Sequence, residues 1–195
     1  MRSRVVLFGG TFDPIHNAHL EIARAAADRF GLKKVLFVPA ANPPHKSHLA
    51  QAPYEDRIRM AELACGADPR FEVSRIEEGS ARSYSIDTIE KLAAEGVAPL
   101  GFLIGADAFA EIRTWHRWPD VVRLVEFIVV TRPGSVYRIP EGATVHELTG
   151  LNLPISSSEV RAGLARGDAG VPVQAAVLWY IRERGLYQRP NCGAG

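Results

Sequence analysis

The sequence is poor in several features that mark special classes of protein. Two cysteines among 195 residues, Cys65 and Cys192, form neither a disulfide framework nor a CxxC metal pair, which suits a reducing cytoplasm. No apolar run approaches the roughly 20 residues of a membrane-spanning helix, and the N-terminus shows no signal-type apolar segment. A net charge of +1 offers no basic surplus for gripping long nucleic acid. The sequence therefore predicts a cytoplasmic protein that binds neither membranes nor nucleic acid.

Apolar runs alternate with helical patterns along the chain. Strands are expected at residues 5–8, 35–38, 71–76, 100–104, 127–131 and 144–148, and helices at 17–30, 54–65, 85–95, 157–166 and 173–184. This order predicts an α/β fold, a Rossmann-like parallel sheet with helices on both faces, whose site lies at the carboxyl ends of the strands and is completed by the C-terminal helices. Residues 1–188 are interpreted as a single domain and 189–195 as a loose tail.

Glycines follow three of the expected helices. Gly31, Gly66 and Gly185 stand where the helical patterns end, and helices commonly end on a glycine. We therefore expect Gly31 and Gly66 to end their helices and Gly185 to be a C-terminal cap. After the last of them, Leu186 and Tyr187 are expected to pack back on the domain.

The first strand leads through Gly9 and Gly10 into a helix that begins near His16 and His19. A helix N-terminus presents free backbone N–H groups and the positive end of the helix dipole, so it favours phosphate. Histidines add donors that can carry charge near neutral pH. The absence of GxGxxG after this strand argues against a bound nicotinamide redox cofactor. The turn therefore predicts a phosphate site.

Three further polar segments stand at the ends of expected elements: one follows the second strand, one follows the fourth strand, and one lies at the start of the helix expected at 157–166. They are residues 42–46, residues 105–107 and residues 156–161. Asp107 would serve as a helix N-cap in any case. A capping box accounts for one serine and the glutamate of residues 156–161, but not for the remaining hydroxyls and the arginine, which suit an anion. Trp115 and Trp118 fit either core contacts or the stacking of a flat ring.

A zinc site is the alternative interpretation of the histidines. His16 and His19 could be joined by His45 and His48 as ligands. Lys46 stands between the second pair and would repel a cation. We therefore favour phosphate binding over a metal held by histidines.

Residues 9–19 resemble the GGxFDPxHxGH element of the nucleotidylyltransferase superfamily. Within that superfamily the chain resembles the bacterial nicotinate-nucleotide adenylyltransferases. Further matches occur in the family's order at residues 43–46, 83–88, 104–107, 115, 132–134, 155–161 and 185–187. The resemblance thus extends through nearly the whole chain, and the ordered set is far more specific than the histidine motif alone.

The resemblance implies transfer of the adenylyl group of ATP to nicotinate mononucleotide. The residues implied at ATP are Gly9, Gly10, Phe12, His16, His19, Lys46, Gly105, Asp107, Ser156, Ser157 and Arg161. Of these, the implied catalytic residues are His16, His19, Lys46 and Arg161. The residues implied at the mononucleotide are Thr11, Asn42, His45, Tyr84, Ser85, Thr88, Trp115 and Arg132. The resemblance places the pyridine ring on Trp115, its carboxylate near the backbone N–H groups of Tyr84 and Ser85, and Asp107 at the ATP ribose.

Mg²⁺ is expected to accompany ATP, held mainly by phosphates and water rather than by a cage of carboxylates. No residue of the chain is assigned as a metal ligand. A homo-oligomer is left open.

The chain departs from the family pattern at two positions. Ala18 replaces the glycine of HxGH, and its small side chain is expected to be tolerated. Ala40 stands where many relatives have asparagine after the strand-ending proline, so one mononucleotide contact is lost or supplied by Asn42.

Three other functions are weighed against this one. A sister adenylyltransferase would use nicotinamide mononucleotide or phosphopantetheine. A non-catalytic nucleotide-sensing module would release no pyrophosphate. An RNA-linked function ranks last, because the chain has neither a basic surface nor an anticodon-binding domain.

Overall fold

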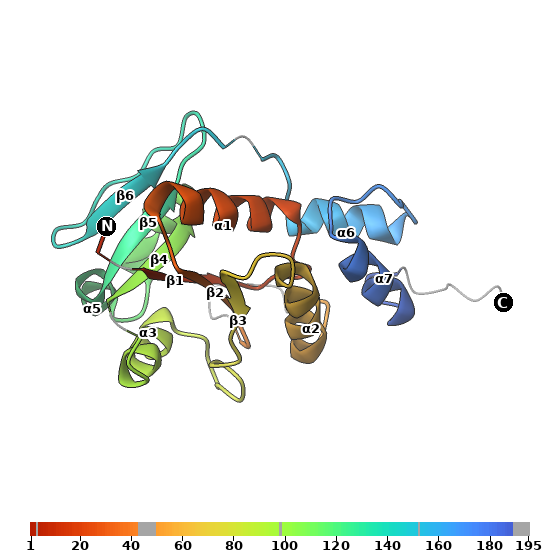
Figure 1. Ribbon diagram of the computed structural model, residues 1–195, viewed down its shortest axis with the longest axis horizontal. Helices are drawn as coiled ribbons and strands as arrows, with labels where there is room; N and C mark the ends of the chain where they lie inside the picture. Colours follow the sequence, from red (N-terminus) through yellow and green to blue (C-terminus); the bar gives the residue numbers. More distant parts are fainter. Residues whose placement is uncertain (3, 43–49, 98, 152, 189–195) are drawn as a thin grey trace.

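The structure, a computed structural model, describes residues 1–2, 4–42, 50–97, 99–151 and 153–188. Its strands are β1 Val5–Gly10, β2 Lys34–Pro39, β3 Phe71–Val73, β4 Leu100–Gly105, β5 Val125–Val130 and β6 Thr144–Leu148. Its helices are α1 Asn17–Phe30, α2 Tyr54–Cys65, α3 Ser85–Ala94, α4 Ala106–Ala110, the 3₁₀ helix η1 Ile112–Thr114, α5 Trp118–Leu124, α6 Ser157–Ala165 and α7 Ala175–Glu183 (Figure 1).

Among these residues no helix is long and apolar enough to cross a membrane. The expected loose tail, residues 189–195, lies outside the described residues. The single domain over 1–188 and the cytoplasmic location stay predictions.

All six strands run parallel, in the order β3-β2-β1-β4-β5-β6. The predicted Rossmann-like α/β fold is confirmed. The chain builds outwards from β1 on one side and from β4 on the other, so the strand order reverses between these two neighbours. In such sheets a crevice opens beyond the carboxyl ends of the strands at the reversal. The ends of β1 and β4 therefore mark the place for a ligand.

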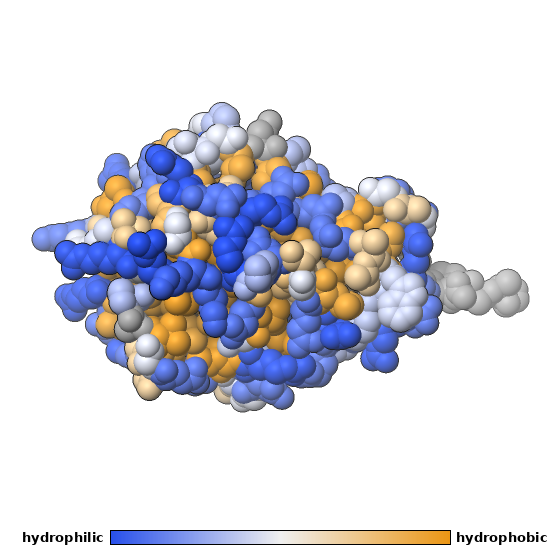
Figure 2. All heavy atoms as spheres, viewed as in Figure 1, coloured by the Kyte–Doolittle hydropathy of each residue, from blue (hydrophilic) through white to orange (hydrophobic). Residues whose placement is uncertain are grey.

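Side chains that alternate along the strands supply two apolar cores. Val6 and Phe8 of β1 belong to a core shared with α1, α2, α6 and α7, whereas Leu7 belongs to a core shared with α3, α4 and α5. Figure 1 shows α1 and α3 on opposite sides of the sheet, and α6 and α7 beyond its end, beside α2. In Figure 2 hydrophilic side chains are interspersed with apolar ones over the viewed face, as is usual for a protein surface.

Two of the ends that differ from expectation have a visible cause. The third strand stops at Val73 rather than 76: the Ser74 N–H makes a last ladder bond to the Phe37 carbonyl, and turns follow in which Glu78 N–H bonds the Arg75 carbonyl and Ser80 N–H bonds the Glu77 carbonyl. The last helix begins at Ala175 rather than 173, after a tight turn in which the Val173 N–H bonds the Val171 carbonyl. Gly66 ends α2 as expected, with right-handed backbone, φ −61°, and its N–H bonds the Glu62 carbonyl at 3.2 Å.

The other two glycines cap their helices as predicted. Gly31 ends α1 in the left-handed conformation, with φ 60°. Gly185 comes directly after Arg184, the C-cap residue of α7, and has a left-handed backbone with φ 61°. The N–H of Leu186 then bonds the Ile181 carbonyl at 3.0 Å. Leu186 and Tyr187 pack on the first core, as expected.

A buried carboxylate joins α2 to the C-terminal helix. Asp56 is 4% exposed, and its Oδ1 accepts the Tyr180 hydroxyl at 2.7 Å and the Arg184 Nε at 3.1 Å. Because both donors lie on α7 or its end, this carboxylate helps hold the C-terminal helix against α2.

We predict that Asp56→Ala lowers the free energy of unfolding by about 2 kcal/mol, because the Tyr180 hydroxyl and the Arg184 guanidinium lose a charged acceptor. Urea titration followed by circular dichroism measures the loss. Glu90→Ala is the control: it removes an ion pair with Arg117 whose two side chains are 45% and 42% exposed, and should cost under about 0.5 kcal/mol. Equal losses in the two variants would contradict a structural role for Asp56.

Candidate active site

A cavity of about 240 Å³ opens at the reversal of strand order. Its wall contains six of the residues predicted from the sequence: Gly9, Gly10, Thr11, Ser85, Gly105 and Trp115. They come from the ends of β1 and β4, the first residue of α3 and the residue after η1. The structure thus gathers at one edge of the sheet residues that lie more than a hundred positions apart.

Trp115 forms an aromatic part of this wall. Its side chain is half-buried, and its ring centroid lies 5.7 Å from that of Phe102 at an angle of 61°. The 3₁₀ turn fixes its backbone, since the Trp115 N–H bonds the Ile112 carbonyl at 3.1 Å. A flat ring in the cavity would find a supported aromatic surface there.

His16 and His19 form a stacked pair at the start of α1. His16 is the N-cap residue and His19 the third residue of the helix; their ring centroids are 3.7 Å apart at 24°. The backbone N–H of His16 donates to Nδ1 of His19 at 3.2 Å. A neutral His19 therefore carries its proton on Nε2, which makes that nitrogen a donor.

Burial keeps His16 neutral at pH 7. Its side chain belongs to a residue only 5% exposed, and desolvation lowers its pKa from 6.5 to about 4, against an opposing effect of the Glu159 charge. Its Nδ1 is buried with no hydrogen-bond partner within the described part of the chain. His16 therefore serves as a neutral group near pH 7, because the cost of burying an imidazolium exceeds the stabilisation that one carboxylate provides.

Aromatic rings support His19 from the core side. The Phe12 ring centroid lies 5.0 Å from that of His19 at 80°, and the Phe8 ring lies 6.0 Å away. Phe12 is 2% exposed and belongs to the first core. A contact between Phe12 and ATP could therefore come only from its backbone, while its ring positions His19.

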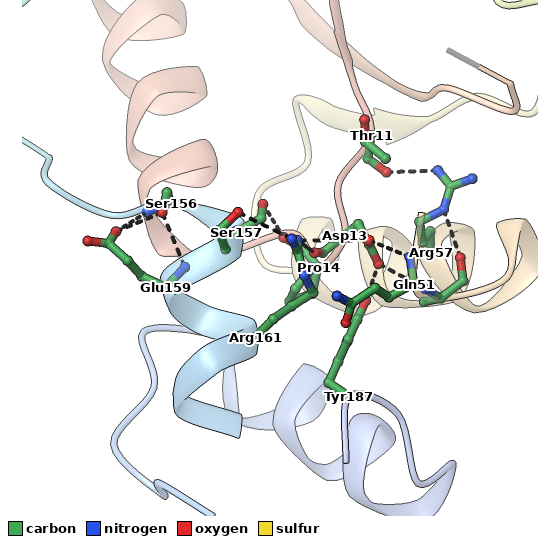
Figure 3. Close-up of polar contacts among 12 residues, drawn as sticks. Thr11, Asp13, Pro14, Gln51, Arg57, Ser156, Ser157, Glu159, Arg161 and Tyr187 are labelled. Carbon is green, nitrogen blue, oxygen red and sulfur yellow. Dashed lines mark hydrogen bonds and ion pairs between the residues drawn. The ribbon is translucent and has the colours of Figure 1, made fainter. Parts of the chain in front are cut away.

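The loop that precedes His16 lies against the N-terminus of α6 (Figure 3). Arg161 donates through Nη1 to the Asp13 carbonyl at 2.6 Å and through Nη2 to the Ser158 hydroxyl at 3.2 Å. The Ser157 hydroxyl donates to the Pro14 carbonyl at 3.1 Å. The structure thus brings Ser157 and Arg161 beside the turn that leads to the histidine pair, 140 residues earlier in the chain.

Ser156 caps α6, and the predicted capping box is confirmed. Its hydroxyl accepts the Glu159 N–H at 3.2 Å, and Glu159 Oε2 in turn accepts the Ser156 N–H at 2.9 Å. The Ser156 hydroxyl also donates to this carboxylate at 2.8 Å. These contacts occupy the hydroxyl that the sequence assigned to ATP.

The buried Asp13 carboxylate ties this region together, and sequence reasoning gave it no role. It accepts the backbone N–H groups of Gln51 at 2.8 Å and Ala52 at 3.1 Å, and the Tyr187 hydroxyl at 2.7 Å. Arg161 lies 3.9 Å from its Oδ2. Burial and the nearby carboxylate raise the pKa of Tyr187, which holds the phenol protonated as a donor. The only signal in the sequence was the match of both residues to family motifs.

Two predicted mononucleotide residues, Asn42 and Thr88, have structural partners, whereas Tyr84, implied through its backbone N–H, is the N-cap residue of α3. The Asn42 amide donates to the Ser80 carbonyl at 2.8 Å. Thr88 is 3% exposed and donates to Glu77 Oε1 at 2.8 Å. The Tyr84 ring lies 4.4 Å from that of His116, outside the cavity wall.

Other predicted residues lie beside the cavity or outside the described residues. Arg132 lines a separate hollow with Thr149 and Leu151, beyond the end of β5. Asp107 is exposed in the first turn of α4, whose N-cap is Gly105, so the expected N-cap aspartate is wrong. Residues 43–49, with His45, Lys46 and His48, lie outside the described residues.

Ala18, which stands where the family has glycine, faces the interior of the protein. Ala18 is 2% exposed, on the first turn of α1 between the two histidines. Its methyl group therefore does not project into open space where a ligand could approach.

Two buried charged residues were missed from the sequence. Arg57 is 2% exposed and Glu77 is 7% exposed, and Glu77 lines the cavity. Burial lowers the pKa of Arg57, while the charges of Asp13 and Glu77 oppose that shift. Arg57 could have been found, because it shares the apolar face of α2 with Ala61 and Ala64, at helical spacing.

The histidine pair makes stability depend on pH. Because His16 has a pKa of about 4 when folded and 6.5 when unfolded, only the unfolded chain takes up this proton between those values. Stability is therefore highest above about pH 6.5 and falls as the pH drops towards 4. We predict that wild type loses about 3 kcal/mol more than His16→Gln over this range, measured by urea unfolding at each pH. Parallel pH curves for the two proteins would contradict this account.

Comparison with known proteins gives one consistent assignment. Residues 7–163 match the family described as cytidylyltransferase-like. A protein of Solibacter usitatus named a probable nicotinate-nucleotide adenylyltransferase is 60% identical over 187 residues, which cover 94% of this chain and 99% of that one. A protein of Salinispora arenicola with the same name is 41% identical over 189 residues, 93% of this chain and all of that one.

A solved structure shares the fold. Nicotinic acid mononucleotide adenylyltransferase of Plasmodium falciparum, in complex with NaAD, superposes with a TM-score of 0.75 at 19% identity, over 95% of this chain and 98% of that one. At this identity the likeness concerns the fold, and the sequence relatives carry the assignment. With matches that span nearly the full length of both chains, this chain belongs to the nicotinate-nucleotide adenylyltransferase family of cytidylyltransferase-like proteins.

Proposed function

We propose that this protein transfers the adenylyl group of ATP to nicotinate mononucleotide, giving nicotinate adenine dinucleotide and pyrophosphate in NAD biosynthesis. In a chain of this family, the observation that carries the proposal is the placement of two features at one sheet edge. These are the cavity walled by Trp115 and the stacked histidine pair of α1. One can hold a flat ring and the other can face phosphates.

The mononucleotide would occupy the cavity with its pyridine ring against Trp115. Ser85 begins α3 and lines the same cavity, so the free N–H groups of this helix start are at hand for the carboxylate of the ring. These N–H groups can stabilise the carboxylate of the ring even though no lysine side chain is assigned to it. This arrangement would favour the acid over the amide form of the mononucleotide.

The reaction needs alignment more than it needs a base. The 5′-phosphate oxygen of the mononucleotide attacks the α-phosphorus of ATP, and the bond to the leaving pyrophosphate breaks. Because the attacking oxygen is already anionic, no proton has to be removed from it. Catalysis then depends on holding both phosphates in line and on donors placed where negative charge grows.

The histidine pair and α6 would supply those donors. His19 offers Nε2–H, and His16 offers a neutral imidazole whose Nδ1 is buried and lacks a protein partner within the described residues. Ser157 and Arg161 lie beside the turn that leads to this pair. Lys46 is assigned to the same phosphates by its motif, and Asp107 to the ATP ribose.

Mg²⁺ would enter with ATP. The described residues contain no group of three or more His, Cys, Asp and Glu side chains able to hold a metal ion. Mg²⁺ commonly takes phosphate oxygens and water as most of its ligands, and there it neutralises phosphate charge. The residues of the chain would bind and align the complex.

Pyrophosphate release tests the proposal. Wild-type protein with ATP and Mg²⁺ is assayed with nicotinate mononucleotide, nicotinamide mononucleotide and phosphopantetheine in turn. Fastest release with the nicotinate form is expected. Preference for another acceptor would indicate a sister adenylyltransferase, and nucleotide binding without any release would indicate a sensing module.

We predict that His19→Ala lowers kcat by roughly 10²–10³-fold, because a donor positioned for the transition state is removed. Steady-state kinetics measure the change, and thermal melting checks that the variant folds. His146→Gln is the matched control, since this histidine pairs with Glu126 at β5 and β6 and takes no part in the site. Near-normal turnover by His19→Ala would exclude His19 from the reaction.

A further inference from the structure

A single peptide group in the cavity wall lies between two buried, oppositely charged side chains. It joins Ala40 to Ala41, directly after the end of β2 at Pro39. Ala40 lines the cavity, at the position where the family commonly places asparagine. This part of the wall therefore consists of backbone and a methyl group. Its position depends on the hydrogen bonds that the backbone makes.

Arg57 holds the carbonyl end of this peptide. Its Nη1 donates to the Ala40 carbonyl at 2.8 Å and to the Thr11 carbonyl at 2.8 Å, and its Nε donates to the Ala52 carbonyl at 3.3 Å. One guanidinium thus connects the end of β1, the end of β2 and the segment before α2. Since Thr11 and Ala40 both line the cavity, Arg57 sets the distance between two of its walls.

Glu77 holds the N–H end of the same peptide. Its Oε2 accepts the Ala41 N–H at 3.3 Å, and its Oε1 accepts the Thr88 hydroxyl at 2.8 Å. Thr88 lies one turn into α3, whose first residue, Ser85, lines the cavity. Glu77 thus connects the wall after β2 to the helix start proposed for the substrate carboxylate.

The charges suit the peptide between them. A peptide group carries a dipole of about 3.5 D, with its negative end at the oxygen and its positive end at the N–H. The guanidinium faces the oxygen and the carboxylate faces the N–H, so both charges favour the observed orientation. Both side chains are buried, where such interactions are stronger than in water.

We propose that Arg57 and Glu77 act as a pair of positioning residues that clamp the Ala40–Ala41 peptide and thereby set the fit of the cavity for the mononucleotide. The proposal rests on the proposed function for the identity of that ligand. The clamp itself is a property of the fold. Neither residue has to touch ATP or the reacting phosphates.

Glu77→Gln tests the clamp with little change in shape. Glutamine carries an NH₂ group in place of one carboxylate oxygen, so the Ala41 N–H and the Thr88 hydroxyl no longer each face a negatively charged acceptor. We expect KM for nicotinate mononucleotide to rise about tenfold, the effect of losing one charge-assisted hydrogen bond, while KM for ATP stays within about twofold. Amide hydrogen exchange at Ala41, measured without substrate, should speed up in the same variant.

Asp56→Asn is the matched control. It also changes a buried acid to its amide, on the helix that carries Arg57, but its partners lie on the α7 side and not in the cavity wall. We expect it to lower the melting temperature without changing KM for the mononucleotide or exchange at Ala41. Glu77→Asp, which keeps the charge but shortens its reach, replaces the glutamine variant if that variant does not fold.

A double-mutant cycle with Arg57→Lys tests whether the two residues act on one peptide. Lysine keeps the positive charge but lacks the planar guanidinium, whose Nε and Nη1 donate to the carbonyls of Ala52, Thr11 and Ala40. If the clamp is shared, the double variant raises KM by clearly less than the product of the two single effects. If the KM increase of the double variant instead equals the product of the two single increases, the shared clamp is overturned.

The outcomes separate this inference from the proposed function. Normal turnover of nicotinate mononucleotide by wild type, with unchanged KM and unchanged Ala41 exchange in Glu77→Gln, overturns the clamp and leaves the function intact. A wild type that neither binds nor adenylates the mononucleotide overturns the function, and Ala41 exchange in Glu77→Gln then still decides whether the clamp exists.

Discussion

The site depends on one buried carboxylate. Asp13 accepts hydrogen bonds from the segment before α2, through Gln51 and Ala52, and from Tyr187 after α7, and it lies near the guanidinium of Arg161 on α6. A carboxylate taken out of water needs several such donors, and here they come from segments far apart in the chain. Its partners therefore fix the loop that leads to the histidine pair. Through this carboxylate, the loop before the histidine pair is joined to the C-terminal part of the chain.

Electrostatic preorganisation is common to both halves of the site. On the phosphate side, burial keeps His16 neutral, so it offers a hydrogen-bonding group without a resident charge that an empty site would have to stabilise. On the cavity side, Arg57 and Glu77 hold a peptide between opposite charges. Arg57 and Glu77 bond mostly to backbone groups. They make the cavity side rigid, because moving either would leave a charge unpaired.

Much of the fold could be predicted from local pattern. The bounds of α1, α2 and β6 matched expectation, because their periodicity and end signals lie within a few residues of one another. Gly9 and Gly105 were placed in one site by their positions at the ends of parallel strands, Ser85 and Trp115 were placed there by the family resemblance, and all four line the cavity. The expected third strand was too long because an apolar residue at 76 continues the pattern into a turn, whose hydrogen bonds join Arg75 to Glu78 and Glu77 to Ser80.

The amino-acid sequence by itself determined the order of strands and helices, the parallel sheet and the family of the chain, because these follow from periodicity and from ordered motifs. Only the tertiary structure decided which polar side chains face the cavity and which are held elsewhere. Asn42 and Thr88 carry suitable groups, yet they bond Ser80 and Glu77, and only packing reveals those partners. The neutral state of His16 likewise comes from burial, a property of the assembled fold that spacing along the chain does not carry.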